Sequence, residues 1–317
     1  MQNSKMKMTL SRFLGAVTLI LGAVTLALTP LTPTPVFAAN PYVGGSGIFL
    51  AWEWANGRAT GCISDAEITS NINWLQAHGM NQALLNLTAV DSNGNLGLGK
   101  YDCEHNYIRV ANTIAPNLIV TGYLSGALSN VNDPNDWANI ANVVQLQFDL
   151  GVDTVNLDFE PYRTDATTVN NYKGLFAAVR NRVGATKQLS LDYTTDPGYQ
   201  WAPADYTAIS AYFNVIMPMS YDSSCTTVTC YHNVLGPVWA AQSANLATGV
   251  KLMPILPAYK KNRWHNPSIE NICTSTNKLW SMLGAGQMTI QNVAVWWHYE
   301  WTSTDDGYWN SSCWLTH

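Results

Sequence analysis

The sequence predicts an α/β protein built as a single-domain (β/α)8 TIM barrel, and three observations support this prediction. Eight short apolar runs recur along the chain, and segments with helical spacing lie between them. Strand and helix alternating in this way are typical of a closed parallel barrel. Residues 39–317 also match the usual barrel size of about 250 residues. A doubly wound open sheet is the rival architecture, but no Gly-x-Gly-x-x-Gly follows a strand and opens a helix.

Residues 1–38 have the pattern of a secretory signal peptide. Three basic residues and no acidic one precede the apolar run FLGAVTLILGAVTLALT, and Val36 and Ala38 fit the small-x-small rule for cleavage. We expect cleavage after Ala38 or Ala39, which makes the protein secreted and extracellular, with no membrane association afterwards. A retained membrane anchor is the alternative, because the apolar run is nearly long enough to span a bilayer.

The expected elements follow the alternation of apolar runs and helical segments. The expected strands lie at 47–52, 82–90, 117–125, 152–159, 188–193, 213–221, 250–258 and 292–297. Ser64 and Glu67 form a capping-box pattern at the start of the first helix. Further helices are expected at 104–114, 133–150, 167–184, 202–212, 234–246 and 267–285. Few residues follow the eighth strand, so the last helix is expected to be short or missing.

Charge and composition exclude some partners. Loss of the three basic residues of the leader would take the formal net charge from −5 to −8. An acidic surface argues against nucleic acid as a partner, but it is compatible with a neutral sugar polymer. The cysteines and histidines show no metal-binding spacing, so no metal and no cofactor are expected. We expect the protein to act as a monomer.

The cysteines predict a disulfide framework. All six follow the leader, at Cys62, Cys103, Cys225, Cys230, Cys273 and Cys313. An even number in a secreted chain indicates disulfides, although six cysteines allow 15 pairings. Bridges 62–103, on one rim of the barrel, and 225–230, across a small loop, fit the expected strands. A third bridge, 273–313, would then tie the tail to the last long helix, and only geometry can decide among the pairings.

The segment GVDTVNLDFEP, residues 151–161, contains the main candidate site. Asn156, Asp158 and Glu160 stand at every second position of an expected strand. Alternate residues of a strand face opposite sides, so these three side chains should point into the barrel. Glu160, the last of them, would lie at the carboxyl-end rim, where barrel enzymes carry their chemistry.

Two interpretations of this polar strand compete. Parallel strands are normally apolar on both faces, and burying three polar groups costs several kcal/mol unless each has a partner. A solvated edge strand would also alternate in polarity, but this strand is central in the expected order. A functional site is therefore favoured. A carboxyl beside a second carboxyl can also keep its proton near neutral pH, which suits a general acid.

Three motifs resemble family 18 of the glycoside hydrolases, the family of chitinases and endo-β-N-acetylglucosaminidases. DTVNLDFE is similar to the signature Asp-Gly-x-Asp-x-Asp-x-Glu, from which Thr154 and Asn156 depart. MSYD, from Met219 to Asp222, resembles the Met-x-Tyr-Asp of the sixth strand. VAVW, ending at Trp296, resembles the last strand. The Ser-x-Gly-Gly of the third strand is not evident in TGYLSG.

The resemblance implies retaining, substrate-assisted cleavage of β-1,4-linked N-acetylglucosamine, in chitin or in the chitobiose core of N-glycans. Glu160, Asp158 and Tyr221 would be the catalytic residues: the acid, the carboxylate that orients the acetamido group, and the donor to its carbonyl.

Substrate-binding residues are implied as well, and one departure affects them. The implied set is Asn156, Asp222, Met219, Trp296 and, at the end of the first strand, Trp52. Asn156 cannot exchange a proton with Asp158 as an acid there could, so an altered pH profile or a reduced rate is expected. The segment 259–291 has room for one helix but not for the α+β insertion of some chitinases, which favours an open groove and endo-action.

Two other functions stay open. A glycan-binding, chitinase-like protein with little or no turnover is compatible with Asn156. A conventional retaining glycosidase could pair Glu160 with a second carboxylate such as Glu53, if the two carboxyl groups lie about 5–5.5 Å apart.

Overall fold

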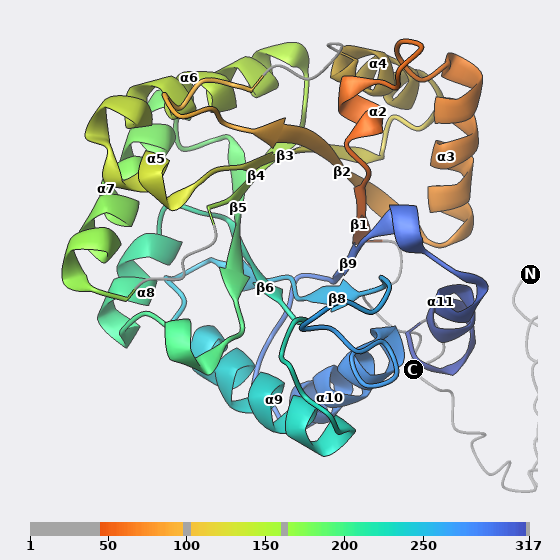
Figure 1. The fold of residues 1–317 in the computed structure, drawn as a ribbon, viewed down its shortest axis with the longest axis vertical. Coiled ribbons are helices and arrows are strands. Elements are labelled where there is room, and N and C mark those ends of the chain that lie inside the picture. Colours follow the sequence, from red (N-terminus) through yellow and green to blue (C-terminus); the bar gives the residue numbers. More distant parts are fainter. Residues whose placement is uncertain (1–44, 98–102, 160–163, 315–317) are drawn as a thin grey trace, which may run out of the picture. The chain divides into compact units, whose positions relative to one another are not determined.

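The fold is a closed parallel β-barrel surrounded by helices. The computed structural model describes residues 45–97, 103–159 and 164–314. The strand segments follow the order β5-β4-β3-β2-β1-β9-β8-β6-β7, and pairing of β5 with β6 closes the barrel. All of these strand pairs are parallel. Figure 1 looks down the ring of strands and shows the helices around it. The predicted (β/α)8 TIM barrel is confirmed.

The strands coincide with the predicted apolar runs. They are β1 Ser46–Leu50, β2 Met80–Ala89, β3 Ile119–Ser125, β4 Thr154–Asp158, β5 Gln188–Thr194, β6 Val215–Met219, β7 Lys251–Leu252, β8 Ile255–Pro257 and β9 Ala294–Trp296. The predicted seventh strand is split into β7 and β8, both of which pair with β6. Pro254 lies between the two pieces, and a proline has no N–H to donate to a ladder.

The helices are α2 Glu53–Asn56, α3 Asp65–Ala77, α4 Glu104–Ile114, α5 Leu128–Asn132, α6 Pro134–Leu150, α7 Ala166–Val183, α8 Pro203–Ser210, α9 Val228–Ala244, α10 Ile272–Gly284 and α11 Ser303–Gly307. The long helices fall near their predicted positions, whereas the short α2 and α5 are not predicted and α9 begins six residues before its expected start. The capping box at α3 is confirmed, since Glu67 N donates to Ser64 Oγ over 3.3 Å and the Glu67 carboxylate accepts from Ser64. The last helix is short, as expected, because α11 has five residues.

The core has two parts that follow from the two faces of the strands. The larger part includes outward-facing strand residues such as Val155 and Leu157, together with helix residues such as Ile72 and Phe176. The smaller part lies inside the barrel and contains no helix residue. It consists of strand residues and of Met253, which lies between β7 and β8: Phe49, Leu84, Tyr123, Met217, Met219, Met253, Ile255 and Ala294. Aromatic and methionine side chains thus fill the barrel beneath its carboxyl end.

Two of the three disulfides join segments that are 41 and 40 residues apart in the chain, and the other closes a short loop. Cys62 pairs with Cys103, Cys225 with Cys230, and Cys273 with Cys313. All three proposed bridges are therefore confirmed. The last bridge fastens the chain after α11 to α10, so the short final helix is held by a covalent link.

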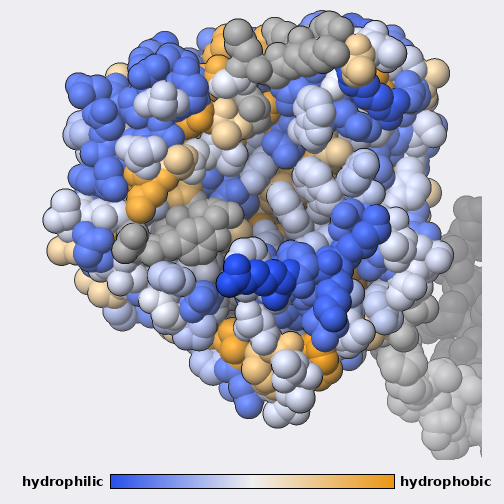
Figure 2. Space-filling view, viewed as in Figure 1, coloured by the Kyte–Doolittle hydropathy of each residue, from blue (hydrophilic) through white to orange (hydrophobic). Residues whose placement is uncertain are grey.

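The surface around the barrel axis is mostly hydrophilic, with apolar side chains in small separate patches (Figure 2). Among the helices of the described residues, none combines the length and the apolar character that crossing a bilayer requires. The predicted signal peptide, residues 1–38, lies outside the described residues.

The disulfides should differ in their effect on stability. Replacing Cys62 and Cys103 together by serine opens a link across 41 residues, whereas Cys225 and Cys230 are five residues apart. From loop-closure entropy, the first loss should lower the free energy of unfolding by about 4 kcal/mol and the second by about 2 kcal/mol. Urea unfolding of the two double variants measures the difference, and equal losses would contradict the entropic account.

Candidate active site

A cavity of about 430 Å³ opens at the carboxyl end of the barrel. Strand ends and the loops after them supply its lining, which consists of Tyr123, Asp158, Tyr221, Asp222, Tyr259, Lys260, Lys261, Asn262, Trp296, Trp297 and Glu300. Asp158 is the last residue of β4, and Trp296 is the last residue of β9. Barrel enzymes carry their chemistry at this end of the strands. The structure thus brings together four predicted site residues: Asp158, Tyr221, Asp222 and Trp296.

Strand β4 has the predicted two-residue alternation. Val155 and Leu157 belong to the core shared with the helices, whereas Asn156 and Asp158 face the barrel interior and are 0% and 6% exposed. Glu160, the predicted acid, lies outside the described residues. Its location at the carboxyl-end rim of the barrel therefore stays a prediction.

Tyr123 of β3 holds the Asp158 carboxyl in place. Its hydroxyl donates a short hydrogen bond to Asp158 Oδ2. Burial, followed by the carboxyls of Asp158 and Asp192, raises the pKa of Tyr123 well above its usual value. The phenol therefore stays protonated and acts as a donor. Register explains the contact, because Tyr123 pairs with Asn156 and the next inward-facing residue of β4 is Asp158.

Asn156 lies beneath the cavity and binds the neighbouring strands. Its Nδ2 donates to Ser190 Oγ and to Asp192 Oδ1 of β5, each over 2.9 Å, and contacts Met217 Sδ of β6 at 3.2 Å. Asn156 does not line the cavity, so its role as a substrate ligand stays a prediction. The observed contacts make it a link between β4 and β5.

Aromatic rings form one wall of the cavity. Trp296 stacks on Trp297 with ring centroids 4.9 Å apart and faces Tyr221 at 6.2 Å. Phe49 and Tyr123 meet Trp296 edge-on. Met219 is buried within the interior cluster against which Tyr221 and Trp296 pack. A flat, rigid aromatic surface of this kind suits the C–H face of a sugar ring.

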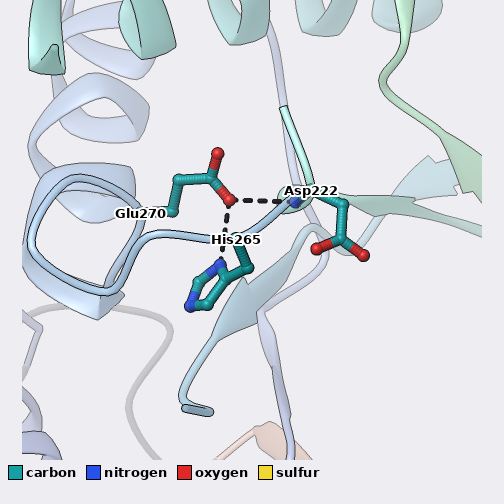
Figure 3. Close-up of side chains that lie close together, drawn as sticks. All are labelled: Asp222, His265 and Glu270. Carbon is teal, nitrogen blue, oxygen red and sulfur yellow. Dashed lines mark hydrogen bonds and ion pairs between the residues drawn. The ribbon is translucent and has the colours of Figure 1, made fainter. Parts of the chain in front are cut away.

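The loop after β6 is held by a buried carboxylate from the loop before α10. Asp222 and Ser224 both have φ of 57°, a left-handed conformation that side chains other than glycine rarely adopt. Glu270 accepts the backbone N–H groups of Asp222 and Ser223 over 2.9 and 3.0 Å. Its oxygens also accept from the Ser223 hydroxyl and from His265 Nδ1. Figure 3 shows Glu270 between His265 and the Asp222 backbone.

Asp222, His265 and Glu270 place potential ligand atoms within 4.8 Å of one another, which is close enough for a metal ion. Their hydrogen bonds argue against that use. The Glu270 oxygens already accept four donors, and His265 Nε2 faces the carbonyl oxygen of Tyr259 at 3.1 Å. Asp222 Oδ1 accepts from the Tyr259 hydroxyl over 2.7 Å. The cluster is therefore a hydrogen-bonded support for the loop.

Two residues considered from the sequence lie elsewhere. Trp52 precedes α2, is 48% exposed, and is not among the described residues that line the cavity. Glu53 forms an ion pair with Arg58 over 3.0 Å. The Glu53 carboxylate, considered as the partner of Glu160 in a conventional retaining pair, is therefore already paired with Arg58.

The structure adds Tyr123, Asp192, Tyr259, His265 and Glu270 to the site and its support. A signal for Asp192 was present in the sequence, because Ser190, Asp192 and Thr194 alternate along β5 as the polar residues do along β4. Tyr123 stands at an inward position of TGYLSG. His265 and Glu270 lie in a loop without periodicity, and only the tertiary structure brings them to Asp222.

Comparison with known proteins supports the fold and nothing finer. No protein-family model matches the sequence, and no curated protein matches it. Among solved structures, the Group IV chitinase of Ostrinia furnacalis is 12% identical, with a TM-score of 0.58 over 86% of this chain and 97% of that chain. A chitinase from Bacteroides thetaiotaomicron is 13% identical, with a TM-score of 0.58 over 83% and 92%.

A third similar structure is the spore cortex-lytic enzyme SleL of Bacillus megaterium QM B1551. It is 11% identical, with a TM-score of 0.52 over 80% of this chain and 71% of that chain. The chain thus has the barrel fold of these chitinases, in agreement with the resemblance to family 18. At such identities the likeness establishes the fold alone.

The Glu270 support should matter for stability without any metal. The Glu270 carboxylate is fully buried and accepts hydrogen bonds from several donors. In Glu270→Gln the charge is lost and the amide NH2 group cannot accept from these donors, so the free energy of unfolding should fall by about 3 kcal/mol. The control is Glu67→Gln, which removes an exposed ion pair with Arg58 and should cost clearly less, because solvent screens such a pair. Chelator and added divalent cations should leave the melting temperature unchanged. A melting temperature that falls with chelator would identify a metal site instead.

His298 should make stability depend on pH. Burial, with a smaller effect of His78, lowers the pKa of His298 from 6.5 to about 4. Between these values the unfolded chain binds a proton that the folded protein does not, so stability falls as the pH drops from 6.5 to 4. His298→Gln should remove this part of the slope. Denaturant unfolding of both proteins measures it, with pH 7–8 as the reference window, and a constant difference across pH 4–6.5 would contradict the prediction.

Proposed function

We propose that this chain is a glycoside hydrolase that cleaves β-1,4-linked N-acetylglucosamine, in chitin or in the chitobiose core of N-glycans. The observation that carries the proposal is the geometry of the cavity. The Asp158 carboxyl, held by Tyr123, lines the same cavity as Tyr221 and the Trp296 ring. The shared barrel fold of the chitinases supports the same class of function.

The proposed reaction is substrate-assisted and retains configuration. Glu160 donates its proton to the glycosidic oxygen as the bond to the anomeric carbon breaks. The acetamido carbonyl oxygen of the substrate forms a bond to that carbon, which gives a cyclic oxazolinium ion. The Glu160 carboxylate then takes a proton from water as the water oxygen attacks the anomeric carbon, and the acetamido group and the protonated Glu160 are restored.

Described residues can support each stage of this reaction. In this proposal Asp158 accepts the acetamido N–H and stabilises the oxazolinium charge, and the Tyr221 hydroxyl donates to the acetamido oxygen. The Trp296 ring offers a floor for the sugar. Asp222, whose carboxylate accepts from Tyr259, can bind a sugar hydroxyl at the cavity mouth. Together they give an anion, a donor and an apolar surface around one site.

The open shape of the site supports endo-action. Between β8 and β9 the chain forms α10 and loops, without an additional domain above the cavity. We propose that a polymer or glycan can lie across the mouth of the barrel and be cut internally. In this proposal the enzyme acts as a secreted monomer after removal of residues 1–38, and it needs no cofactor.

Fluorogenic oligomers of N-acetylglucosamine, tested beside matching glucose oligomers, check the proposed function. The wild-type protein should hydrolyse only the acetylated series. Glu160→Gln should lower kcat at least about 100-fold, because general acid catalysis contributes a factor of this size. Tyr221→Phe should lower kcat about tenfold through the loss of one hydrogen bond.

The matched control is Glu53→Gln, which removes a carboxylate that is paired with Arg58. It should leave kcat within about twofold of the wild type. Hydrolysis of glucose oligomers that is lost in Glu53→Gln would favour a conventional retaining pair. Binding of acetylated oligomers without hydrolysis would favour a glycan-binding protein.

A further inference from the structure

Strand β5 carries a second buried carboxyl group beneath the cavity. Asp192 is 1% exposed and is not among the described residues that line the cavity. Its Oδ1 accepts a hydrogen bond from Asn156 Nδ2 over 2.9 Å. An aspartate this deeply buried is costly, and a neutral residue would fill the position at lower free energy. Its presence therefore calls for a physical role.

Strand register places Asp192 beside Asp158. In the parallel pair β4–β5, Asn156 pairs with Ser190 and Leu157 with Leu191. One step further along both strands stand Asp158 and Asp192. Adjacent strands are about 4.8 Å apart, so the two residues are neighbours in the barrel wall.

The two side chains also face the same way. Asn156 Nδ2 reaches both Ser190 and Asp192, so these residues of β5 point into the barrel with Asn156. Asp158, two residues after Asn156, points to the same side. Tyr123 confirms this direction, because its hydroxyl donates to Asp158 from β3. Two carboxyl groups therefore share the barrel interior, one at the cavity and one beneath it.

Buried carboxyl groups of neighbouring residues on adjacent strands are not expected to ionise independently. The first ionisation is favoured by the hydrogen bonds that Tyr123 and Asn156 donate. The second must place a like charge beside the first in a medium of low dielectric constant, which raises its pKa. Such a pair titrates in two macroscopic steps that belong to the pair. The high pKa of Tyr123, to which both carboxyls contribute, fits this arrangement.

We propose that Asp158 and Asp192 form a coupled pair that keeps one proton near neutral pH, with Asp192 as a positioning residue that acts through Asp158. The inference rests on the proposed function for its catalytic consequence. While the proton rests on Asp192, Asp158 is the carboxylate that faces the substrate. When the proton moves to Asp158, Asp192 takes the negative charge and the total number of protons is unchanged.

This pair gives Asn156 a clear role. An amide at position 156 cannot carry the proton, but its Nδ2 holds the Asp192 carboxyl in position by donating to Oδ1. The acid that the sequence motif lacks at position 156 is thus supplied by the adjacent strand. The reduced rate expected from Asn156 need not follow, because a second carboxyl stands one strand away.

Other titratable groups bear on the same pair and enter any pH profile. Tyr123 approaches from β3, and Tyr221 from the loop after β6. Glu160 follows Asp158 along the chain and lies outside the described residues. A spectroscopic test must therefore be made on a protein without the Glu160 carboxyl. The signal of Asp192 is then obtained by subtracting the spectrum of the same protein without the Asp192 carboxyl.

Infrared spectroscopy of the carboxyl C=O stretch tests the proton directly. In a Glu160→Gln background at pH 7, the difference spectrum against the same protein with Asp192→Asn should contain one protonated carboxyl band. Combining Asn156→Asp with Asp192→Asn moves the acid from β5 to β4 and should restore the band. Ser190→Ala is the control, since it removes the other oxygen acceptor of Asn156 but no titratable group, and the band should remain.

Kinetics on acetylated oligomers, with Glu160 intact, tests the consequence. Asp192→Asn should lower kcat at least tenfold with KM within about threefold, and should shift one limb of the pH profile by about one unit. The exchanged pair, Asn156→Asp with Asp192→Asn, should recover kcat to within about threefold of the wild type. Circular dichroism and unfolding curves establish that each variant is folded.

Each result bears on one of the two proposals. Absence of the protonated band in the folded protein overturns the coupled pair, and so does an unchanged pH profile in Asp192→Asn. A wild-type protein without activity on acetylated oligomers overturns the proposed function, whereas a band that depends on Asp192 would still support the pair.

Discussion

A carboxyl group buried inside the barrel is the constraint around which the rest of the site is arranged. Asp158 is 6% exposed, so its charge must be balanced by donors that the protein itself supplies. Tyr123 supplies one from β3, and its raised pKa keeps it a donor. The same constraint extends to β5, where Asp192 accepts from Asn156. Polar residues on three adjacent strands thus form hydrogen bonds at the wall of the cavity and beneath it.

The second requirement of the site is a rigid wall opposite these carboxyl groups. Trp296 is packed against Trp297, Phe49 and Tyr123, which leaves its ring little freedom. Tyr221 lies against Trp296, two residues after β6, and the next residue, Asp222, has a left-handed backbone. That conformation persists because Glu270 holds its N–H groups. The position of the donor Tyr221 therefore depends on Glu270, which lies 48 residues after Asp222 in the chain.

The barrel explains why groups so distant in sequence can act together. Parallel strands bring all of their carboxyl ends to one rim, and each strand contributes one or two inward side chains there. Register between neighbours then decides which of these side chains meet. Tyr123 pairs with Asn156, and Asn156 pairs with Ser190, so each inward residue has a partner at its own height. The inward residues at the carboxyl ends of the strands thus restrict the chemistry of the site.

The sequence by itself determined the barrel and the inward direction of Asn156 and Asp158, because periodicity and capping residues are local signals. It suggested three disulfides, and the structure decided their pairing. It also placed Tyr221 and Trp296 on the correct strand ends. The tertiary structure alone decided that Tyr123 binds Asp158, that Asn156 reaches Asp192, and that Glu270 and His265 support the loop at Asp222. These contacts depend on strand register and on the course of an irregular loop, and no periodic pattern in a single sequence encodes either.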